Sequence, residues 1–236
     1  MILDCSKYVG PCRCGREHTL ETKKVVVEYN ALDKFDQYMD EVGLSGKRAV
    51  IYDTNTYNLP TLRHVRADQE IVLNAEGLHS EKGMIEDMMR QLDHPDVIVA
   101  VGSGTIMDFG RYPAYHLGIP FVAVPTLASS DGFTANICSI IIDGQKKSIA
   151  MQAAALVVCD LNVVSGAPLW LTVSGISDIL AKYISLADWK IAHLVSGEYY
   201  CPMVADLAQE ALTIMRKAAD DMAAGGKPDF EAMTMA

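Results

Sequence analysis

Short apolar runs alternate with longer amphipathic segments through the first two thirds of the chain. The short runs are rich in Val and Ile and are bounded by polar residues, Gly or Pro, which is typical of strands. The predicted strands are Lys24–Tyr29, Arg48–Tyr52, Glu70–Leu73, Val97–Val101, Phe121–Val124 and Leu156–Cys159. The predicted helices are Ala31–Val42, Ser80–Gln91, with Ser80 as a possible N-cap, and Thr105–Leu117. This alternation predicts an α/β domain over residues 1–165, built on a doubly wound, mainly parallel sheet.

Two segments of this first part do not follow the alternation. Residues 1–22 have no clear periodicity, and we expect an irregular lead-in to the first strand. Ser139–Asp143 and Lys147–Met151 flank a Gly-Gln pair, which is typical of a β-hairpin.

The pattern changes near residue 166. The chain from Pro168 to Leu194 has helical periodicity with almost no strand signal, and Gly175 is the predicted break. Tyr199–Ala224 is predicted to be a second long helix with an apolar stripe along one side. Residues 166–236 are thus predicted to form a helical domain that is too thin to bury this stripe. We expect the domain to be incomplete, or to be completed by a partner such as a second copy of the chain.

The stretch Asp96–Asp108, with the sequence DVIVAVGSGTIMD, joins a buried strand to a helix through a glycine turn. Gly102 and Gly104 would let the backbone turn sharply and let a ligand approach the helix N-terminus, where an anion such as a cofactor pyrophosphate can bind. The alternative is an ordinary strand–helix turn that needs glycine. Met107 stands where a full G-x-G-x-x-G motif would have its third glycine, so the motif alone does not decide between them.

Polar residues also follow two other strands of the predicted sheet. Asp53 comes directly after the second strand, and the loop Pro125–Gly132, with the sequence PTLASSDG, follows the fifth. Ligands of open α/β sheets collect at the carboxyl ends of strands, so we expect Asp53, the glycine turn and this loop to line one crevice. The alternative for the loop is a polar turn, because small hydroxyl residues and Gly are common in turns.

Composition and charge exclude several classes of protein. Half of the residues are apolar, which is enough for a sizeable core, and the formal net charge is −10. This negative charge argues against nucleic acid or an anionic membrane as a partner. No uninterrupted apolar run reaches the length of a membrane span, and the N-terminus has no signal-peptide pattern. We therefore expect a cytoplasmic protein without membrane insertion.

The chain has six cysteines. Cys138 and Cys159 lie in apolar runs and are predicted to be reduced core residues. Cys5, Cys12, Cys14 and His18 are close enough in sequence to ligate zinc. Their spacing is not C-x-x-C and no second pair follows, so the sequence favours free thiols over a metal site.

Four motifs in order resemble one known family: D-T-N-T from Asp53, G-S-G-T-I-M-D from Gly102, P-T-L-A-S-S-D-G from Pro125, and G-I-S-D-I-L-A-K-Y from Gly175. They resemble the sn-glycerol-1-phosphate dehydrogenase family of the iron-type alcohol dehydrogenase superfamily, which includes glycerol dehydrogenase and dehydroquinate synthase. The resemblance implies a Rossmann-like nucleotide-binding domain and an all-helical domain with the site in the cleft between them. It also implies NAD(H) or NADP(H) and a divalent metal, Zn or Ni, as cofactors.

The resemblance assigns roles to particular residues. Asp53 would bind the adenosine end of the cofactor, Asp131 would contact the substrate, and Asp178 would ligate the metal. The other cofactor-binding residues would be Gly102, Gly104, Thr105, Ile106, Met107 and Asp108 at the pyrophosphate, continued by Thr126, Leu127, Ala128 and Ser129. The alternative for Asp178 is a surface ion pair with Lys182, four residues along the same helix face.

The chain departs from the family pattern in two ways. Ala135 stands where the family usually has a serine that contacts the cofactor. The family also needs two histidine metal ligands after the aspartate, and only His193 follows Asp178. His193 is predicted to be a helix residue and not a ligand, so we expect both family histidines to lie after Ala236.

The resulting hypothesis is an NAD(P)-dependent, metal-dependent dehydrogenase that interconverts dihydroxyacetone phosphate, a small phosphorylated substrate, and sn-glycerol 1-phosphate. Three alternatives remain open. They are a glycerol dehydrogenase acting on an unphosphorylated polyol, a dehydroquinate-synthase-like lyase, and a non-catalytic nucleotide-binding fragment.

Overall fold

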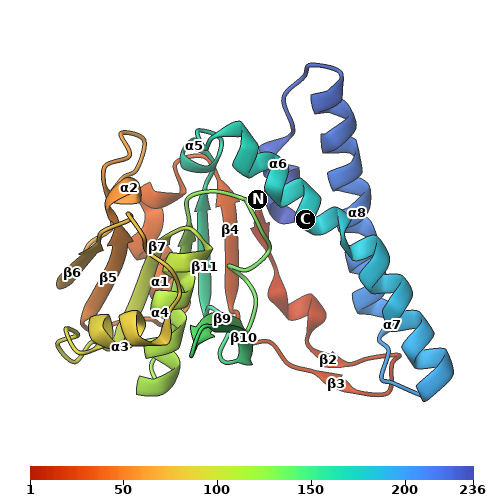
Figure 1. Cartoon of the computed structure of the whole chain (residues 1–236), viewed down its shortest axis with the longest axis horizontal. Helices are drawn as coiled ribbons and strands as arrows, with labels where there is room; N and C mark the ends of the chain where they lie inside the picture. The colour runs from red at the N-terminus through yellow and green to blue at the C-terminus, as the bar shows by residue number, and fades with distance from the viewer. The chain divides into compact units, whose positions relative to one another are not determined.

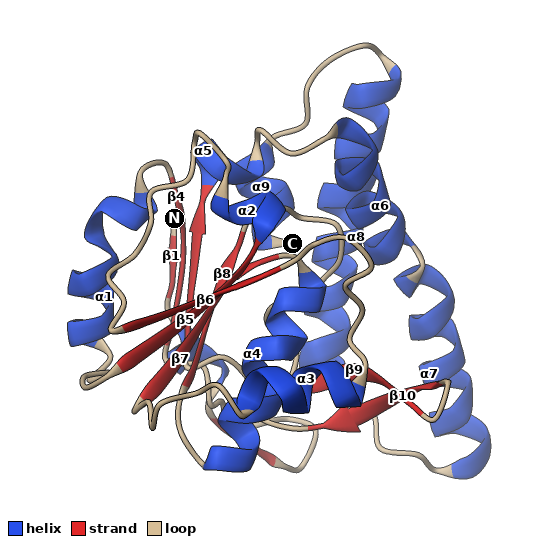
Figure 2. Ribbon diagram, turned by 60° about the vertical axis from the view of Figure 1, so that its left-hand side comes forward, coloured by secondary structure: helices blue, strands red, loops and turns tan.

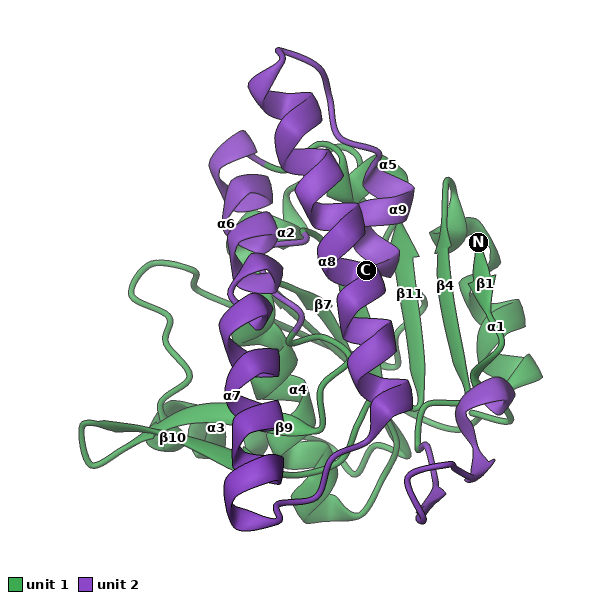
Figure 3. Cartoon of the chain, turned by 90° about the vertical axis from the view of Figure 1, so that its right-hand side faces the viewer, with its two compact units in different colours: residues 1–5, 21–127, 132–167 green, residues 6–20, 128–131, 168–236 purple.

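The structure, a computed structural model, describes all residues from Met1 to Ala236 and divides into two compact units (Figure 3). Unit 1 contains residues 1–5, 21–127 and 132–167, and unit 2 contains residues 6–20, 128–131 and 168–236. The helical unit therefore takes in two segments, 6–20 and 128–131, from the part of the sequence that was assigned to the α/β domain.

Unit 1 is built on a seven-stranded sheet with the order β1-β4-β11-β8-β7-β5-β6 (Figure 1). The strands are β1 (Ile2–Leu3), β4 (Lys24–Glu28), β5 (Arg48–Asp53), β6 (Gln69–Leu73), β7 (Val97–Gly102), β8 (Phe121–Pro125) and β11 (Leu156–Asp160). All neighbours pair in parallel except β1, which runs antiparallel to β4. The predicted parallel, doubly wound sheet is confirmed.

Helices cover both faces of this sheet (Figure 2). The remaining elements of unit 1 are η2 (Ala31–Lys34), α1 (Phe35–Glu41), α2 (Thr54–Tyr57), α3 (Lys82–Met89), α4 (Gly104–Leu117), β9 (Ile137–Ile142), β10 (Gln145–Ala150) and α5 (Leu161–Val164). Val99 faces one side of the sheet, in a core cluster with Phe35 of α1. On the other side α4 packs so closely that a Cβ added to Gly110 would lie 2.7 Å from the Ala100 Cβ. Because both faces are covered, the central strands β7, β8 and β11 are buried along their whole length and are continuous apolar runs, not alternating ones.

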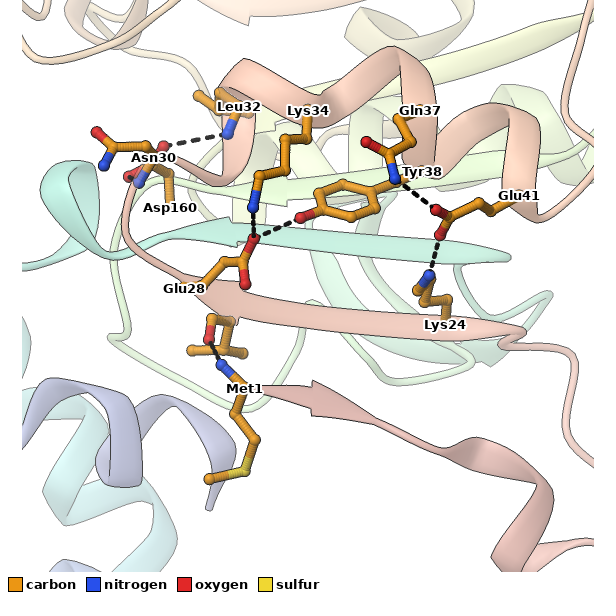
Figure 4. Close-up of polar contacts among 11 residues, drawn as sticks. Met1, Lys24, Glu28, Asn30, Leu32, Lys34, Gln37, Tyr38, Glu41 and Asp160 are labelled. Carbon is orange, nitrogen blue, oxygen red and sulfur yellow. Dashed lines mark hydrogen bonds and ion pairs between the residues drawn. The ribbon is translucent and has the colours of Figure 1, made fainter.

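Polar contacts at one edge of the sheet fix η2 and α1 against β4 (Figure 4). Glu28 accepts hydrogen bonds from the Tyr38 hydroxyl and from Lys34 Nζ, the latter at 3.2 Å. Asp160, at the end of β11, accepts the backbone amide of Leu32 at 3.1 Å and that of Asn30 at 3.3 Å. The start of η2 is thus held at the carboxyl end of the sheet.

Unit 2 contains a short ribbon and a group of helices. Its elements are β2 (Gly10–Pro11), β3 (Glu17–His18), α6 (Leu169–Leu180), α7 (Lys182–Ser196), α8 (Pro202–Ala223) and α9 (Phe230–Met235), with η1 (Cys5–Tyr8) at its first boundary. The buried core of the helices is small: Ile176, Ile179, Leu212, Met215, Ala218 and Met233. This core takes up part of the apolar stripe that was predicted on α8.

Three local predictions are wrong. Residues 1–22 are not irregular, because β1 adds to the sheet and β2 pairs with β3. Gly175 lies inside α6, and the helix ends at Leu180 with Ala181 as its C-cap. The N-cap of α3 is Glu81, because the hydroxyl of Ser80 donates elsewhere, to Asp108.

The surface of α6 and α7 is strongly apolar. Trp170, Ile184, Leu194 and Val195 are each at least two thirds exposed. The segment Leu169–Ser196 is long and apolar enough to cross a membrane by length and composition alone, with a mean hydropathy of 1.2. One such segment is weak evidence for a membrane span, so the absence of membrane insertion stays a prediction.

Candidate functional site

The carboxyl ends of three neighbouring strands carry residues predicted to bind the cofactor. β7 pairs with β8 so that Gly102 lies beside Pro125. β5 pairs in parallel with β7 on its other side, so its last residue, Asp53, ends at the same edge. The Thr126 amide donates to the Gly102 carbonyl oxygen at 3.1 Å. The structure therefore brings Asp53, Gly102 and Thr126 to one edge of unit 1, while their role in cofactor binding stays a prediction.

The glycine turn has the geometry of an anion site. A Cβ added to Gly102 would lie 2.8 Å from the Ile106 Cβ, so glycine is needed where the turn packs against α4. Ser103 is the N-cap residue and makes no side-chain capping bond, and Gly104 is exposed at the first position of the helix. The first amides of a helix lack partners within it. The turn thus fits an anion such as a pyrophosphate, which would accept hydrogen bonds from these amides.

The side chains of Ile106, Met107 and Asp108 are buried inside unit 1 and do not form the surface of the turn. Asp108 Oδ2 accepts a hydrogen bond from Ser80 Oγ at 2.9 Å, and Oδ1 accepts the Ser139 amide at 3.3 Å. Burial raises the pKa of the Asp108 carboxyl, and the Ser80 hydrogen bond opposes that increase. The carboxylate of Asp108 thus ties α4 to β9 and to the segment before α3. A contact between these three residues and a cofactor would have to use their backbone.

Asp53 already has a structural role. Its Oδ1 accepts the Thr56 amide at 2.7 Å and caps the N-terminus of α2. This is the ordinary role of an aspartate at an N-cap. Its Oδ2 is the oxygen that remains for a ribose hydroxyl, the bond that the family resemblance implies.

The loop after β8 belongs to both units. Thr126 is buried and Leu127 is half-buried in unit 1, whereas Ala128, Ser129 and Asp131 belong to unit 2. The predicted cofactor-binding and substrate-binding residues of this loop are thus close in sequence, but the first two pack within unit 1 and the others pack within unit 2. Thr105, the remaining residue of the predicted pyrophosphate site, is half-buried beside the exposed Gly104 in unit 1.

In unit 2, the loop lies directly on α6. A Cβ added to Gly175 would lie 2.0 Å from the Ala128 carbonyl oxygen, so only glycine allows this approach. The Ser174 hydroxyl also donates to the Ser129 carbonyl oxygen at 3.4 Å. This role of Gly175 was not predicted from the sequence. The available signal was a glycine inside a strong helical pattern, which usually has a packing or functional reason.

Asp131 and Asp178, the two residues predicted to be catalytic, lie together in unit 2. The Asp131 amide donates to Asp178 Oδ2 at 3.2 Å. Lys182 Nζ lies 2.6 Å from Asp131 Oδ2. The structure does not show the alternative, an ion pair between Asp178 and Lys182, because the ammonium group of Lys182 pairs with Asp131 instead. Asp178 itself is exposed.

The ligand atoms around Asp178 do not form a metal site by themselves. Asp178 does not belong to a group of three or more His, Cys, Asp or Glu ligand atoms lying close together. His193 is held elsewhere, with Nδ1 2.7 Å from the Glu198 carbonyl oxygen and its ring stacked on Tyr200. A single carboxylate is too weak a ligand set for a catalytic zinc, which needs about three protein ligands. No reaction step through a metal follows from these residues.

The structure has one group of potential metal ligands, at a different place in unit 2. It consists of Cys12, Cys14, His18 and Cys201. Cys5, which the sequence grouped with the first three, lies in unit 1 and is not a member. Cys138 and Cys159 are buried free thiols, as predicted. Cys201 was not predicted as a member, because it lies 183 residues after His18 in the chain.

The chain is similar along its whole length to known proteins. It is 32% identical to "Glycerol-1-phosphate dehydrogenase [NAD(P)+]" of Halalkalibacterium halodurans over 100% of this chain and 62% of that protein. It is 33% identical to the protein of the same name from Bacillus licheniformis over 98% of this chain and 60% of that protein. The chain thus spans about three fifths of the length of these curated relatives.

Solved structures with the same fold are more distant in sequence. A probable glycerol dehydrogenase from Sinorhizobium meliloti matches with a TM-score of 0.72 and 21% identity over 89% of this chain and 61% of that chain. An iron-containing alcohol dehydrogenase from Thermotoga maritima matches with a TM-score of 0.70 and 18% identity over 93% of this chain and 66% of that chain. The model of the family described as "Iron-containing alcohol dehydrogenase" matches residues 26–168. The chain belongs to the iron-containing alcohol dehydrogenase family.

Proposed function

We propose that this chain is the cofactor-binding part, with the first helices, of an NAD(P)-dependent and metal-dependent oxidoreductase that interconverts dihydroxyacetone phosphate and sn-glycerol 1-phosphate. The observation that carries the proposal is the similarity, over nearly the whole chain, to two proteins named glycerol-1-phosphate dehydrogenase. The glycine turn at the start of α4, with Gly104 exposed, supports dinucleotide binding, because its amides suit a pyrophosphate.

The proposal gives the two units different tasks. In unit 1, the turn from Gly102 to Thr105 would bind the pyrophosphate and Asp53 the adenosine ribose. In unit 2, Asp131 and Asp178 would face the substrate. The ammonium group of Lys182, which is paired with Asp131, would supply a positive charge for a phosphorylated substrate. The metal, Zn or Ni, would need ligands in addition to Asp178. The protein would act in the cytoplasm as a homo-oligomer, without nucleic acid or membrane partners.

The experiment is an NADH-oxidation assay of the 236-residue chain with dihydroxyacetone phosphate or dihydroxyacetone, in the presence of Zn²⁺ or Ni²⁺. We expect no turnover with either ketone, because Asp178 alone is too weak a metal ligand. Turnover with dihydroxyacetone phosphate would support the function but refute this ligand argument. Turnover with dihydroxyacetone would instead favour the glycerol dehydrogenase alternative.

Binding provides the second measurement. The chain loaded with NADH is titrated with each ketone by calorimetry, with the Halalkalibacterium halodurans relative as the comparison protein. The proposal predicts that the phosphorylated ketone binds more tightly than the unphosphorylated one, and that Lys182→Met reduces this difference while Lys190→Met does not. Equal binding of the two ketones would contradict a phosphorylated substrate.

A further inference from the structure

Four ligand-type side chains meet in unit 2, away from Asp131 and Asp178. Cys12, Cys14 and His18 come from the ribbon β2–β3 and its turn, and Cys201 lies directly before α8. One ligand atom from each residue lies within 4.8 Å of every other one. None of the four takes part in the proposed dehydrogenase chemistry.

The distances between these atoms match those around a tetrahedral zinc ion. Zinc binds thiolate sulfur at about 2.3 Å and imidazole nitrogen at about 2.0–2.1 Å, so tetrahedral geometry places two sulfurs about 3.8 Å apart and a sulfur and a nitrogen about 3.6 Å apart. Cys12 Sγ lies 3.8 Å from Cys201 Sγ, and Cys201 Sγ lies 3.5 Å from His18 Nε2. The third pair, Cys14 Sγ and His18 Nε2, is somewhat closer at 3.2 Å.

The sequence forms this arrangement through a tight turn. The Cys12 amide donates to the Arg16 carbonyl oxygen at 2.9 Å, and the Gly15 amide donates back to the Cys12 carbonyl oxygen at 3.0 Å. Gly15 has a φ of 83°, which glycine adopts without strain. The turn directs Cys12 and Cys14 toward the same point. On the other side, Pro202 starts α8 and fixes the chain at the buried Cys201.

The surroundings of the four residues support a permanent site. The Tyr199 hydroxyl lies 3.1 Å from Cys14 Sγ, and the Arg16 guanidinium stacks on the Tyr199 ring at 3.5 Å. Groups that contact the ligands of a metal, and not the metal itself, orient these ligands and tune the site. Arg13, between the two ribbon cysteines, also forms an ion pair with Asp206 on α8.

We propose that Cys12, Cys14, His18 and Cys201 bind a structural Zn²⁺ ion that fastens the N-terminal ribbon to the start of α8. Three soft thiolates and an imidazole suit zinc, and four protein ligands close the coordination sphere, as in structural sites. The ribbon has only two short strands, and the helices of unit 2 share a small core. A metal that binds only the folded form stabilises such a unit.

The first test is metal analysis of the purified full chain, followed by X-ray absorption at the zinc edge. We expect one zinc per chain with a shell of sulfur at about 2.3 Å and one nitrogen at about 2.0–2.1 Å. Modification of the thiols should release this zinc, a measurement that needs no variant. A chain that stays metal-free after incubation with Zn²⁺, or a shell of oxygen and nitrogen alone, would overturn the proposal.

Variants then assign the ligands. Cys12→Ser and Cys201→Ser should each lose the sulfur-bound zinc, whereas the matched control Cys5→Ser, in the same N-terminal segment, should keep it. Hydrogen exchange tests whether zinc holds the ribbon against α8. Removal of zinc from the unmodified chain should reduce the protection of the backbone amides of residues 10–18 and leave the protection of the unit 1 sheet unchanged. A Cys12–Cys201 disulfide in the purified chain, found by mass spectrometry without reduction, would contradict the zinc site.

Discussion

Replacement of Gly175 by alanine tests how the loop after β8 is held on α6. Alanine normally stabilises a helix interior by about 1 kcal/mol relative to glycine. At Gly175, however, the new Cβ would lie 2.0 Å from the Ala128 carbonyl oxygen, where ordinary contact begins near 3.4 Å. The loop and the helix would have to separate by about 1.4 Å, the difference between these two distances.

The magnitude follows from the balance of these two effects. Overpacking of this kind costs about 1–3 kcal/mol, and more when the obstacle is backbone that cannot rotate away. Because the obstacle at Gly175 is backbone, the cost should lie in the upper part of this range, at about 2–3 kcal/mol. After the gain of about 1 kcal/mol in helix propensity, we expect a net loss of about 1–2 kcal/mol. The matched control is Gly83→Ala on α3, where an added Cβ meets nothing within 4 Å. That control should raise the free energy of unfolding by about 0.5–1 kcal/mol. The same Gly→Ala substitution should therefore destabilise the chain at position 175 and stabilise it at position 83.

The assay is thermal unfolding of both variants by circular dichroism. A free-energy change of 1 kcal/mol shifts the Tm of a chain of this size by about 2–4 °C. Gly175→Ala should therefore melt below the unmodified chain and Gly83→Ala above it. A Gly175→Ala variant that is as stable as Gly83→Ala would refute the close contact between Ala128 and α6, and with it the placement of Asp131 beside Asp178.

Three further predictions concern unit 1. We expect NADH to be preferred over NADPH, because the carboxylate of Asp53 would repel the 2′-phosphate of NADPH by roughly 1–2 kcal/mol. Asp53→Asn keeps an N-cap but removes this charge, so it should reduce the difference in affinity between the two cofactors in parallel fluorescence titrations. An unchanged difference would exclude the charge of Asp53 as its cause. Arg111→Met should destabilise the chain to urea by about 2–4 kcal/mol, because the buried guanidinium donates to the Gly132 carbonyl oxygen at 2.9 Å, and a neutral result would contradict that role. The hydrogen bond from the Tyr38 hydroxyl lowers the pKa of Glu28 below its ordinary value of 4.5. The ionised Glu28 therefore stabilises the folded chain at pH values above 4.5, and this stabilisation is lost as the pH falls through the pKa of Glu28 in the folded state. Glu28→Gln should accordingly reduce the dependence of Tm on pH on the acid side.

The sheet of unit 1 could be predicted because its strands are continuous apolar runs bounded by polar residues. Val97–Val101 was predicted to be a strand because it has five apolar residues in a row, and the structure extends this strand by one residue to Gly102. The strand at the start of residues 1–22 could not be predicted, because Ile2 and Leu3 form it only by pairing with Val25 and Val26 of β4. Such pairing depends on residues distant in the sequence, and so leaves no local periodicity.

The candidate site could be predicted where it depends on strand ends. Asp53 and Gly102 share an edge because parallel strands end together, which the order of elements implies. The cysteine group could not be found, since Cys201 is brought to His18 by the fold. The role of Gly175 was also hidden, because the same residue would fit a helix break, and only the position of the Ala128 carbonyl decides between the two.

Dinucleotide binding at the start of α4 is the central requirement of the proposed function. The measurement is a calorimetric titration of NADH into the full chain and into Gly104→Val, with Gly83→Ala as the control. A valine at this exposed first position of the helix would put a branched side chain where phosphate oxygens must approach the amides. We predict that the unmodified chain and the control bind NADH equally and that Gly104→Val binds at least about tenfold more weakly, a loss of about 1.4 kcal/mol. Unchanged NADH affinity in Gly104→Val, or no NADH binding by the unmodified chain, would contradict the account.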